Sequence, residues 1–175
     1  AGLEYTFANP TGETIRGVYS FHARNFMSTE TAGEDVRTKE NGFVLWQPGS
    51  EEKPEDQGAF GAAVDDPQVR VNGAWFRGGW FDALTMAWKS IEAGEAPLSE
   101  PPTEGAPSPG ASLYVPFELE PGEERVIRLR LAWHVPETDL RLGADPEDGC
   151  CEGSCACDEG AHRPWYADVF PDIDA

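Results

Sequence analysis

The sequence predicts a mainly β fold: an antiparallel two-sheet β-sandwich with one short amphipathic helix inserted at about residues 80–93. Two observations support this expectation. Apolar and polar residues alternate with period two in several stretches, and loop-like segments rich in glycine, proline and charge separate them. Only one stretch has helical periodicity, so about six to eight strands with one helix fit the sequence better than an alternating βαβ layout.

The first strands are expected near the start of the sequence. Residues 3–7 (LEYTF) alternate in polarity, residues 9–12 (NPTG) have turn chemistry, and residues 14–21 (TIRGVYSF) resume strand character. This pattern predicts either a β-hairpin or a crossing between sheets. His22 continues the second strand, and a hydrogen-bonded structural histidine is the favoured interpretation of it.

Two further strands are predicted between charged loops. Residues 28–42 and 48–57 are charged or small and read as solvated loops. Residues 43–46 (FVLW) form a short apolar run with strand propensity. Residues 58–64 (GAFGAAV) are small, which suits a strand against which another backbone or an aromatic ring packs closely.

The predicted helix follows a glycine-containing aromatic loop. Within residues 71–94, Leu84, Trp88 and Ile91 recur at helical spacing, which predicts about three turns of amphipathic helix with Trp88 in the core. Gly94 is the expected C-terminal stop. The loop before the helix contains two adjacent glycines, which allow its aromatic side chains to be aimed in unusual directions.

The second half of the chain begins with a proline-rich stretch at residues 95–110, which is expected to be an exposed loop because it has almost no large apolar residue. Residues 113–119 and 127–133 then alternate in polarity around a short turn and predict a β-hairpin. His134 falls on the arginine-bearing face of the second strand, where we expect a solvated position.

Composition restricts the class of partner. The 175 residues include 13 Lys and Arg against 32 Asp and Glu, a formal charge of −19, which argues against binding nucleic acid or an anionic membrane. No apolar run is long enough for a transmembrane segment. Residues 1–175 are interpreted as a single β-sandwich domain or part of one, cut from a longer chain, because strand-like and aromatic patterns run up to both ends.

A cysteine cluster is the clearest candidate metal site. The candidate zinc ligands are Cys150, Cys151, Cys155, Cys157 and His162. Clustered thiolates with an imidazole suit tetrahedral zinc, whereas two disulfides are the alternative in an oxidising compartment, and free thiols are a third. Nearby acidic residues are a weaker candidate for calcium: Asp145, Glu147 and Asp148. The cellular compartment stays open because it depends on the state of these cysteines.

No nucleophile elbow, phosphate-binding loop or His-Glu metalloprotease motif is present. The candidates for a substrate cleft or an interface lie in the loop before the helix: Trp75, Arg77, Trp80 and Asp82. An exposed indole can stack on a sugar ring, with the charged side chains as hydrogen-bonding companions. For Trp75 and Trp80, interface packing and ligand contact both stay open.

Several motifs together resemble a known family. These are GVYSFHARNFM, the segment AWFRGGWFDALTMAWKSI, the proline-rich spacer, and SLYVPFELEPGEERVIRLRLAWHVP, in this order. They resemble the N-terminal β-sandwich domain of glycoside hydrolase family 116, which includes bile-acid β-glucosidase, also called non-lysosomal glucosylceramidase. HRPWYADVF looks like the segment that leads toward the family's catalytic domain, so residues 145–175 are expected to be a cysteine-rich exit.

The resemblance implies a partner and a reaction. In that family the sandwich packs on a six-hairpin α-barrel of the same protein, which performs retaining hydrolysis of β-glucosides or glycolipids with a glutamate nucleophile and an aspartate acid/base. Both carboxylates belong to the barrel, so no catalytic residue is expected in this chain and no cofactor is required.

The expected function is a non-catalytic accessory domain of a β-glucosidase or glucosylceramidase type of enzyme, which packs on the barrel and helps wall its substrate cleft. The alternatives are a stand-alone carbohydrate-binding sandwich and a structural module held by metal or disulfides at the cysteine cluster.

Overall fold

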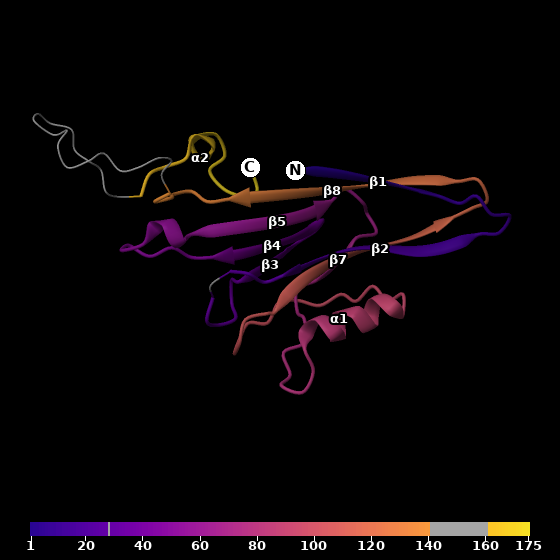
Figure 1. Cartoon of the computed structure of the whole chain (residues 1–175), viewed down its shortest axis with the longest axis horizontal. Helices are drawn as coiled ribbons and strands as arrows, with labels where there is room; N and C mark the ends of the chain where they lie inside the picture. The colour runs from indigo at the N-terminus through magenta and orange to yellow at the C-terminus, as the bar shows by residue number, and fades with distance from the viewer. Residues whose placement is uncertain (28, 141–160) are drawn as a thin grey trace, which may run out of the picture.

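The computed structural model describes residues 1–27, 29–140 and 161–175. Two antiparallel sheets form the molecule, as the sequence predicts (Figure 1). Sheet A has the strand order β1-β8-β5-β4-β3, and sheet B has the order β2-β7-β6. The strands are β1 Gly2–Ala8, β2 Ile15–Arg24, β3 Val36–Lys39, β4 Gly42–Gln47, β5 Gly58–Val64, β6 Arg70–Asn72, β7 Gly110–Leu119 and β8 Glu124–His134. The helices are the 3₁₀ helix η1 Pro54–Asp56 and the α-helices α1 Ala83–Glu92 and α2 Trp165–Val169.

The core lies between the two sheets and follows from the alternation of side chains along each strand. On β8, Ile127 and Leu129 are buried while Arg128 is exposed. On β7, Leu113 and Val115 contribute to the same core from the opposite sheet. Successive side chains of a strand point to opposite faces, so period-two apolar patterns in both strands place one face of each against the other sheet.

The predicted hairpin of residues 113–119 and 127–133 is wrong in its pairing, although both strands exist. β7 pairs with β2 and β6, whereas β8 pairs with β1 and β5. The short turn between them therefore crosses from one sheet to the other. Alternation shows which face of a strand is apolar, but not which neighbour completes its hydrogen bonds.

The crossing from β1 to β2 runs beside the crossing from β7 to β8, so the second of the two sequence alternatives is confirmed. Asn9, which is 1% exposed, lies in the first connection and forms hydrogen bonds with the second. Its backbone N–H donates to the Glu123 carbonyl at 2.9 Å, and its side-chain amide donates to the Leu119 carbonyl at 2.9 Å. Gly122 has a φ of 79°, a left-handed conformation that favours glycine in this turn.

The two predicted middle strands are confirmed as β4 and β5, and small residues allow close approach there. A Cβ atom at Gly42 would lie 2.0 Å from the Ala62 carbonyl oxygen of β5. A Cβ atom at Gly61 would lie 3.4 Å from the Ile173 side chain, which covers the outer face of sheet A. The glycines of β4 and β5 thus allow close approach of a neighbouring backbone and of the Ile173 side chain.

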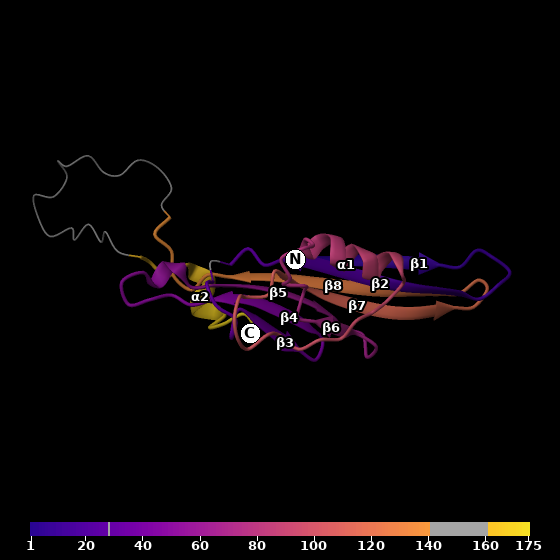
Figure 2. The ribbon, with the colours of Figure 1, turned by 90° about the horizontal axis from the view of Figure 1, so that it is seen from below.

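The two α-helices lie on opposite outer faces of the sandwich (Figure 1). Helix α1 lies below sheet B, and α2 lies over one end of sheet A (Figure 2). The solvated position predicted for His134 is wrong, because the segment around α2 covers it. His134 is 6% exposed, and its Nε2 lies 2.9 Å from the Phe170 carbonyl oxygen. Within the described residues, no helix has the length and hydropathy to span a membrane.

Candidate functional site

Trp75 fixes the segment between β6 and α1 to the sandwich. Its side chain is 4% exposed, its backbone N–H donates to Ser108 Oγ at 3.1 Å, and its indole Nε1–H donates to Ser112 Oγ at 2.8 Å. A Cβ atom at Gly110 would lie 2.6 Å from the indole, so glycine is needed at that position. Trp75, predicted as a cleft or interface candidate, therefore lies in the interior as an anchor.

A small polar cluster surrounds this anchor on the outer face of sheet B. His22 Nδ1 lies 2.8 Å from Ser112 Oγ, and its ring meets the Tyr114 ring edge-on at 5.4 Å between centroids. His22 is therefore hydrogen-bonded through Nδ1, as expected of a structural histidine, but not through its second ring nitrogen. Burial lowers the pKa of His22 and raises the pKa of Tyr114, which favours the neutral form of both rings. His22 Nε2 is buried with no hydrogen-bond partner among the described residues.

Arg77 attaches the same loop to the proline-rich stretch. Its Nη1 donates to the carbonyl oxygens of Glu104 and Ala106 at 2.9 and 2.6 Å. Farther along that stretch, the Ser108 backbone N–H donates to the carboxylate of Asp35 at 3.0 Å, and both residues are buried. The proline-rich stretch is exposed at residues 103–106 and held to the sandwich at Ser108. The guanidinium of Arg77 thus supports the loop.

Asp82 starts α1 as its N-cap. Its carboxylate accepts from the backbone N–H groups of Leu84 and Thr85 at 2.9 and 3.3 Å, and also from the Thr85 hydroxyl. The hydrogen bond from the Thr85 side chain is the main cause of a lowered pKa of Asp82. Asp82 therefore satisfies free N–H groups of the first helical turn.

The outward side of this region is apolar. We call it the α1 surface, and its members are Trp80 (83% exposed), Phe81 (55%), Leu84 (50%) and Trp88 (57%). Leu84 and Trp88 are spaced by four residues, so they lie along one side of the helix, and Trp80 and Phe81 lie in the loop directly before it. The Lys89 ammonium lies over the Phe81 ring, 5.0 Å from its centroid.

The opposite side of α1 carries the half-buried residues Ala83, Met86, Ala87 and Ile91. Helix α1 therefore has apolar residues on two sides, one toward the protein and one toward solvent. The core position predicted for Trp88 is wrong, because the smaller apolar residues occupy the inward side. The predicted helix and its stop are confirmed, with Gly94 at a φ of 65° directly after the C-cap.

The candidate metal ligands Cys150, Cys151, Cys155 and Cys157 lie outside the described residues, as do Asp145, Glu147 and Asp148. His162 is described and exposed, and its backbone forms a bridge with Thr138 at N–O distances of 2.8 and 2.9 Å. The described ranges contain no group of three or more His, Cys, Asp or Glu residues placed to hold a metal ion.

The sequence did not reveal the importance of Ser112, Ser108 and Asp35. All three are buried polar residues that hold the loop before α1 or the proline-rich stretch. Ser112 could have been suspected, because it stands in a strand, ASLYVPF, that is apolar on both sides. A polar residue in such a strand is normally hydrogen-bonded.

Together, fold and site define an antiparallel β-sandwich domain that presents an anchored loop and an apolar helical surface. The chain belongs to the family described as beta-glucosidase 2, glycosyl-hydrolase family 116 N-term, whose profile matches residues 1–175, the whole sequence. The resemblance drawn from the motifs is confirmed, and the chain is an N-terminal domain of a glycoside hydrolase. No curated protein sequence matches the chain.

Proposed function

We propose that this chain is a non-catalytic accessory domain that docks on the six-hairpin α-barrel of a β-glucosidase-type enzyme through the α1 surface, where it helps wall the substrate cleft. The observation that carries the proposal is the exposed apolar side of α1. Soluble proteins seldom expose large contiguous apolar patches, and those that do usually bind a partner there.

The way the α1 surface is held also supports docking. Trp75, Arg77 and Asp82 fix the loop and the first turn of the helix from three directions. A surface that is already ordered loses little conformational entropy on binding. Trp80 and Trp88 are the residue type most enriched among interface residues with large energetic contributions.

The charge of the chain is compatible with this partner and restricts others. With a formal charge of −19, the long-range field favours neutral or basic surfaces over phosphate-rich ones. A β-glucoside is neutral, so a cleft walled by this domain would admit it without charge repulsion. A glycolipid substrate would reach the cleft through the same catalytic domain.

The test compares Leu84→Glu with Val126→Glu in the full-length protein and in the isolated chain. The two side chains have similar exposure, 50% and 43%, but Val126 lies on β8 in sheet A, away from α1. In the isolated chain both variants should keep wild-type thermal stability, because glutamate is tolerated at exposed positions. In the full-length protein only Leu84→Glu should weaken domain association, by about 2 kcal/mol or more.

Limited proteolysis between the domains and hydrolysis of a β-glucoside provide the readouts. We expect Leu84→Glu to speed inter-domain cleavage and lower kcat/KM, while Val126→Glu resembles the wild type. Equal behaviour of the two full-length variants would rule out the α1 surface as the docking site. An intact mass of the native gene product no larger than that of this chain would exclude a covalently linked barrel and favour a stand-alone binding module.

A further inference from the structure

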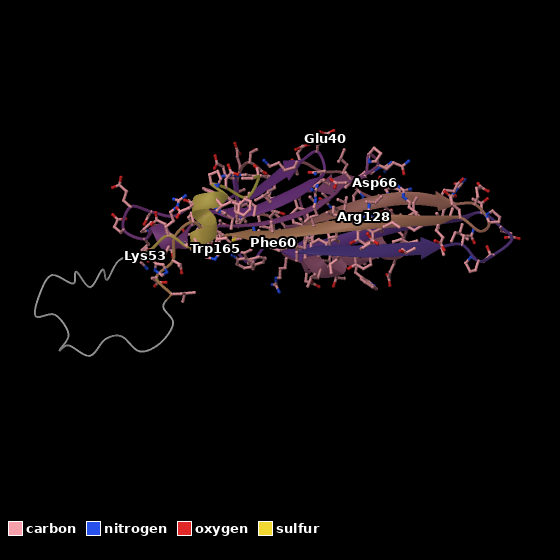
Figure 3. The ribbon with its side chains drawn as sticks, turned by 90° about the horizontal axis from the view of Figure 1, so that it is seen from above. Glu40, Lys53, Phe60, Asp66, Arg128 and Trp165 are labelled. Atoms are coloured by element: carbon pink, nitrogen blue, oxygen red, sulfur yellow. The ribbon has the colours of Figure 1, made fainter. Side chains whose placement is uncertain are left out.

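We propose that a second site, at one end of the sandwich, binds a neutral pyranose sugar by stacking it on Trp133. The site is a hollow of about 320 Å³, here called the Trp133 hollow, lined by residues of four segments: Phe26, Met27, Gln47, Glu55, Gln57 and Trp133. Lys53, which directly precedes η1, lies at this end of the molecule, and Phe60 of β5 lies farther inward (Figure 3). The inference does not depend on the docking of α1.

The indole of Trp133 packs against two other aromatic rings. The Trp133 side chain is the last of the inward-facing side chains of β8. It stacks on Phe26, with ring centroids 5.1 Å apart and ring planes 22° apart. Phe60, its partner across the sheet, meets it edge-on at 6.0 Å. Although one face of the indole rests on Phe26, the side chain is 60% exposed. More than half of the Trp133 side chain is therefore accessible to a flat ligand.

Two polar side chains that line the hollow, Glu55 and Gln57, are free to bind a ligand as far as the described residues show. Glu55 and Gln57 are half-buried, and their side chains make no hydrogen bond or ion pair within the part of the chain that the structure describes. The short helix η1, which carries Glu55, is fixed by a hydrogen bond from the Gln47 amide to the Asp56 carbonyl. The rim thus offers a carboxylate acceptor and an amide with both donors and acceptor.

This combination selects a class of ligand. A pyranose with equatorial hydroxyl groups has a flat face of axial C–H bonds that can lie on an indole, while its adjacent hydroxyls point outward to hydrogen-bond donors and acceptors. The hollow is near the small end of the range for ligand pockets, roughly 300–1,000 Å³, which suits one sugar ring. The charge of −19 and the Glu55 carboxylate disfavour sugars that carry a carboxylate or sulfate.

The probe is methyl β-D-glucopyranoside, titrated into the 175-residue chain while tryptophan fluorescence and ligand saturation-transfer NMR signals are followed. We expect saturable binding with a Kd of about 1–10 mM, because a single ring offers one stacking contact and few hydrogen bonds. Methyl β-D-glucuronide should bind at least about threefold more weakly, because the negative charges of Glu55 and of the chain repel its carboxylate. A lack of saturation with methyl β-D-glucopyranoside would overturn the proposal.

Two variants locate the binding. Trp133→Ala should weaken it by about tenfold or more, and Glu55→Gln, which keeps the shape and cannot disturb the aromatic packing, by about threefold. Trp80→Ala serves as the matched control, because Trp80 is an exposed indole on the α1 surface, and should bind as the wild type.

Binding that survives both Trp133→Ala and Glu55→Gln, or that is lost in Trp80→Ala, would assign the sugar to another surface and overturn the inference. Leu84→Glu should keep full sugar binding, so a failure of the docking proposal and a failure of this one are distinguishable. If Trp133→Ala impairs folding, Glu55→Gln alone decides: unchanged affinity contradicts the site.

Discussion

Ser112 shows how a single residue positions the candidate site. Its hydroxyl accepts a hydrogen bond from the Trp75 indole and meets His22 Nδ1, each at 2.8 Å, within a fully buried environment. A hydroxyl can donate once and accept twice, so Ser112 can donate to neutral His22 while it accepts from Trp75. The loop that leads to the α1 surface is thus fixed by contacts made on β7.

At this scale we predict that the stability of the isolated chain falls on acidification because of His22. Burial lowers the pKa of His22 below its ordinary value of about 6.5, so the unfolded chain takes up this proton before the folded one does. The contribution of His22 to stability is complete above pH 6.5 and is lost as the pH falls below it. The slope can reach about 1.4 kcal/mol per pH unit for one proton.

Urea unfolding between about pH 8 and pH 5 measures this dependence. His22→Asn, whose amide can still meet Ser112, should flatten the curve by the contribution of one proton. His162→Asn, at an exposed histidine, is the matched control. Parallel curves for His22→Asn and wild type would contradict the assignment.

Helix α1 illustrates how an element can be well formed and still weakly attached. It has an N-cap at Asp82 and a left-handed glycine at its end, yet none of its residues is fully buried. Its inward side is only half-buried, and Leu84 and Trp88 face solvent. In the isolated chain, the helix is therefore stabilised only by its terminal caps and by the packing of its half-buried inward side.

We predict that Asp82→Ala loosens α1 without unfolding the sandwich. The substitution leaves the N–H groups of Leu84 and Thr85 without their acceptor. Amide hydrogen exchange in residues 84–87 should speed up several-fold, while exchange in β8 stays at the wild-type rate. Asp82→Asn, which can still accept these bonds, is the matched control. Unchanged exchange in α1 of Asp82→Ala would show that the cap contributes little.

Across the whole molecule, the acidic charge is only partly compensated. The ion pairs of the described residues join mostly exposed side chains, such as Arg16 with Glu118 at 2.5 Å and Arg128 with Glu4 at 2.7 Å. Exposed pairs contribute little to stability. The formal charge of −19 therefore leaves a net repulsion that a compact fold has to overcome.

We predict that salt stabilises the isolated chain. Raising NaCl from about 10 mM to about 0.5 M shortens the screening length from roughly 30 Å to a few ångströms, which weakens repulsion throughout the molecule. The thermal midpoint should rise with NaCl and rise equally with KCl, since screening depends on ionic strength. A midpoint that falls with salt would mean that the exposed ion pairs outweigh the net repulsion.

The sequence by itself determined the fold class, most of the strands and the helix, because apolar periodicity and turn chemistry are local properties. It missed the short strand β3, which lies within residues 28–42 that were expected to be a loop. The motif order also identified the family. Tertiary structure alone decided the pairing of β7 and β8, since an alternating strand does not specify its neighbour. It also decided which tryptophans are exposed: Trp75 is anchored by Ser112, whereas Trp88 faces solvent. Burial depends on residues distant in sequence, and those contacts exist only once the chain has folded.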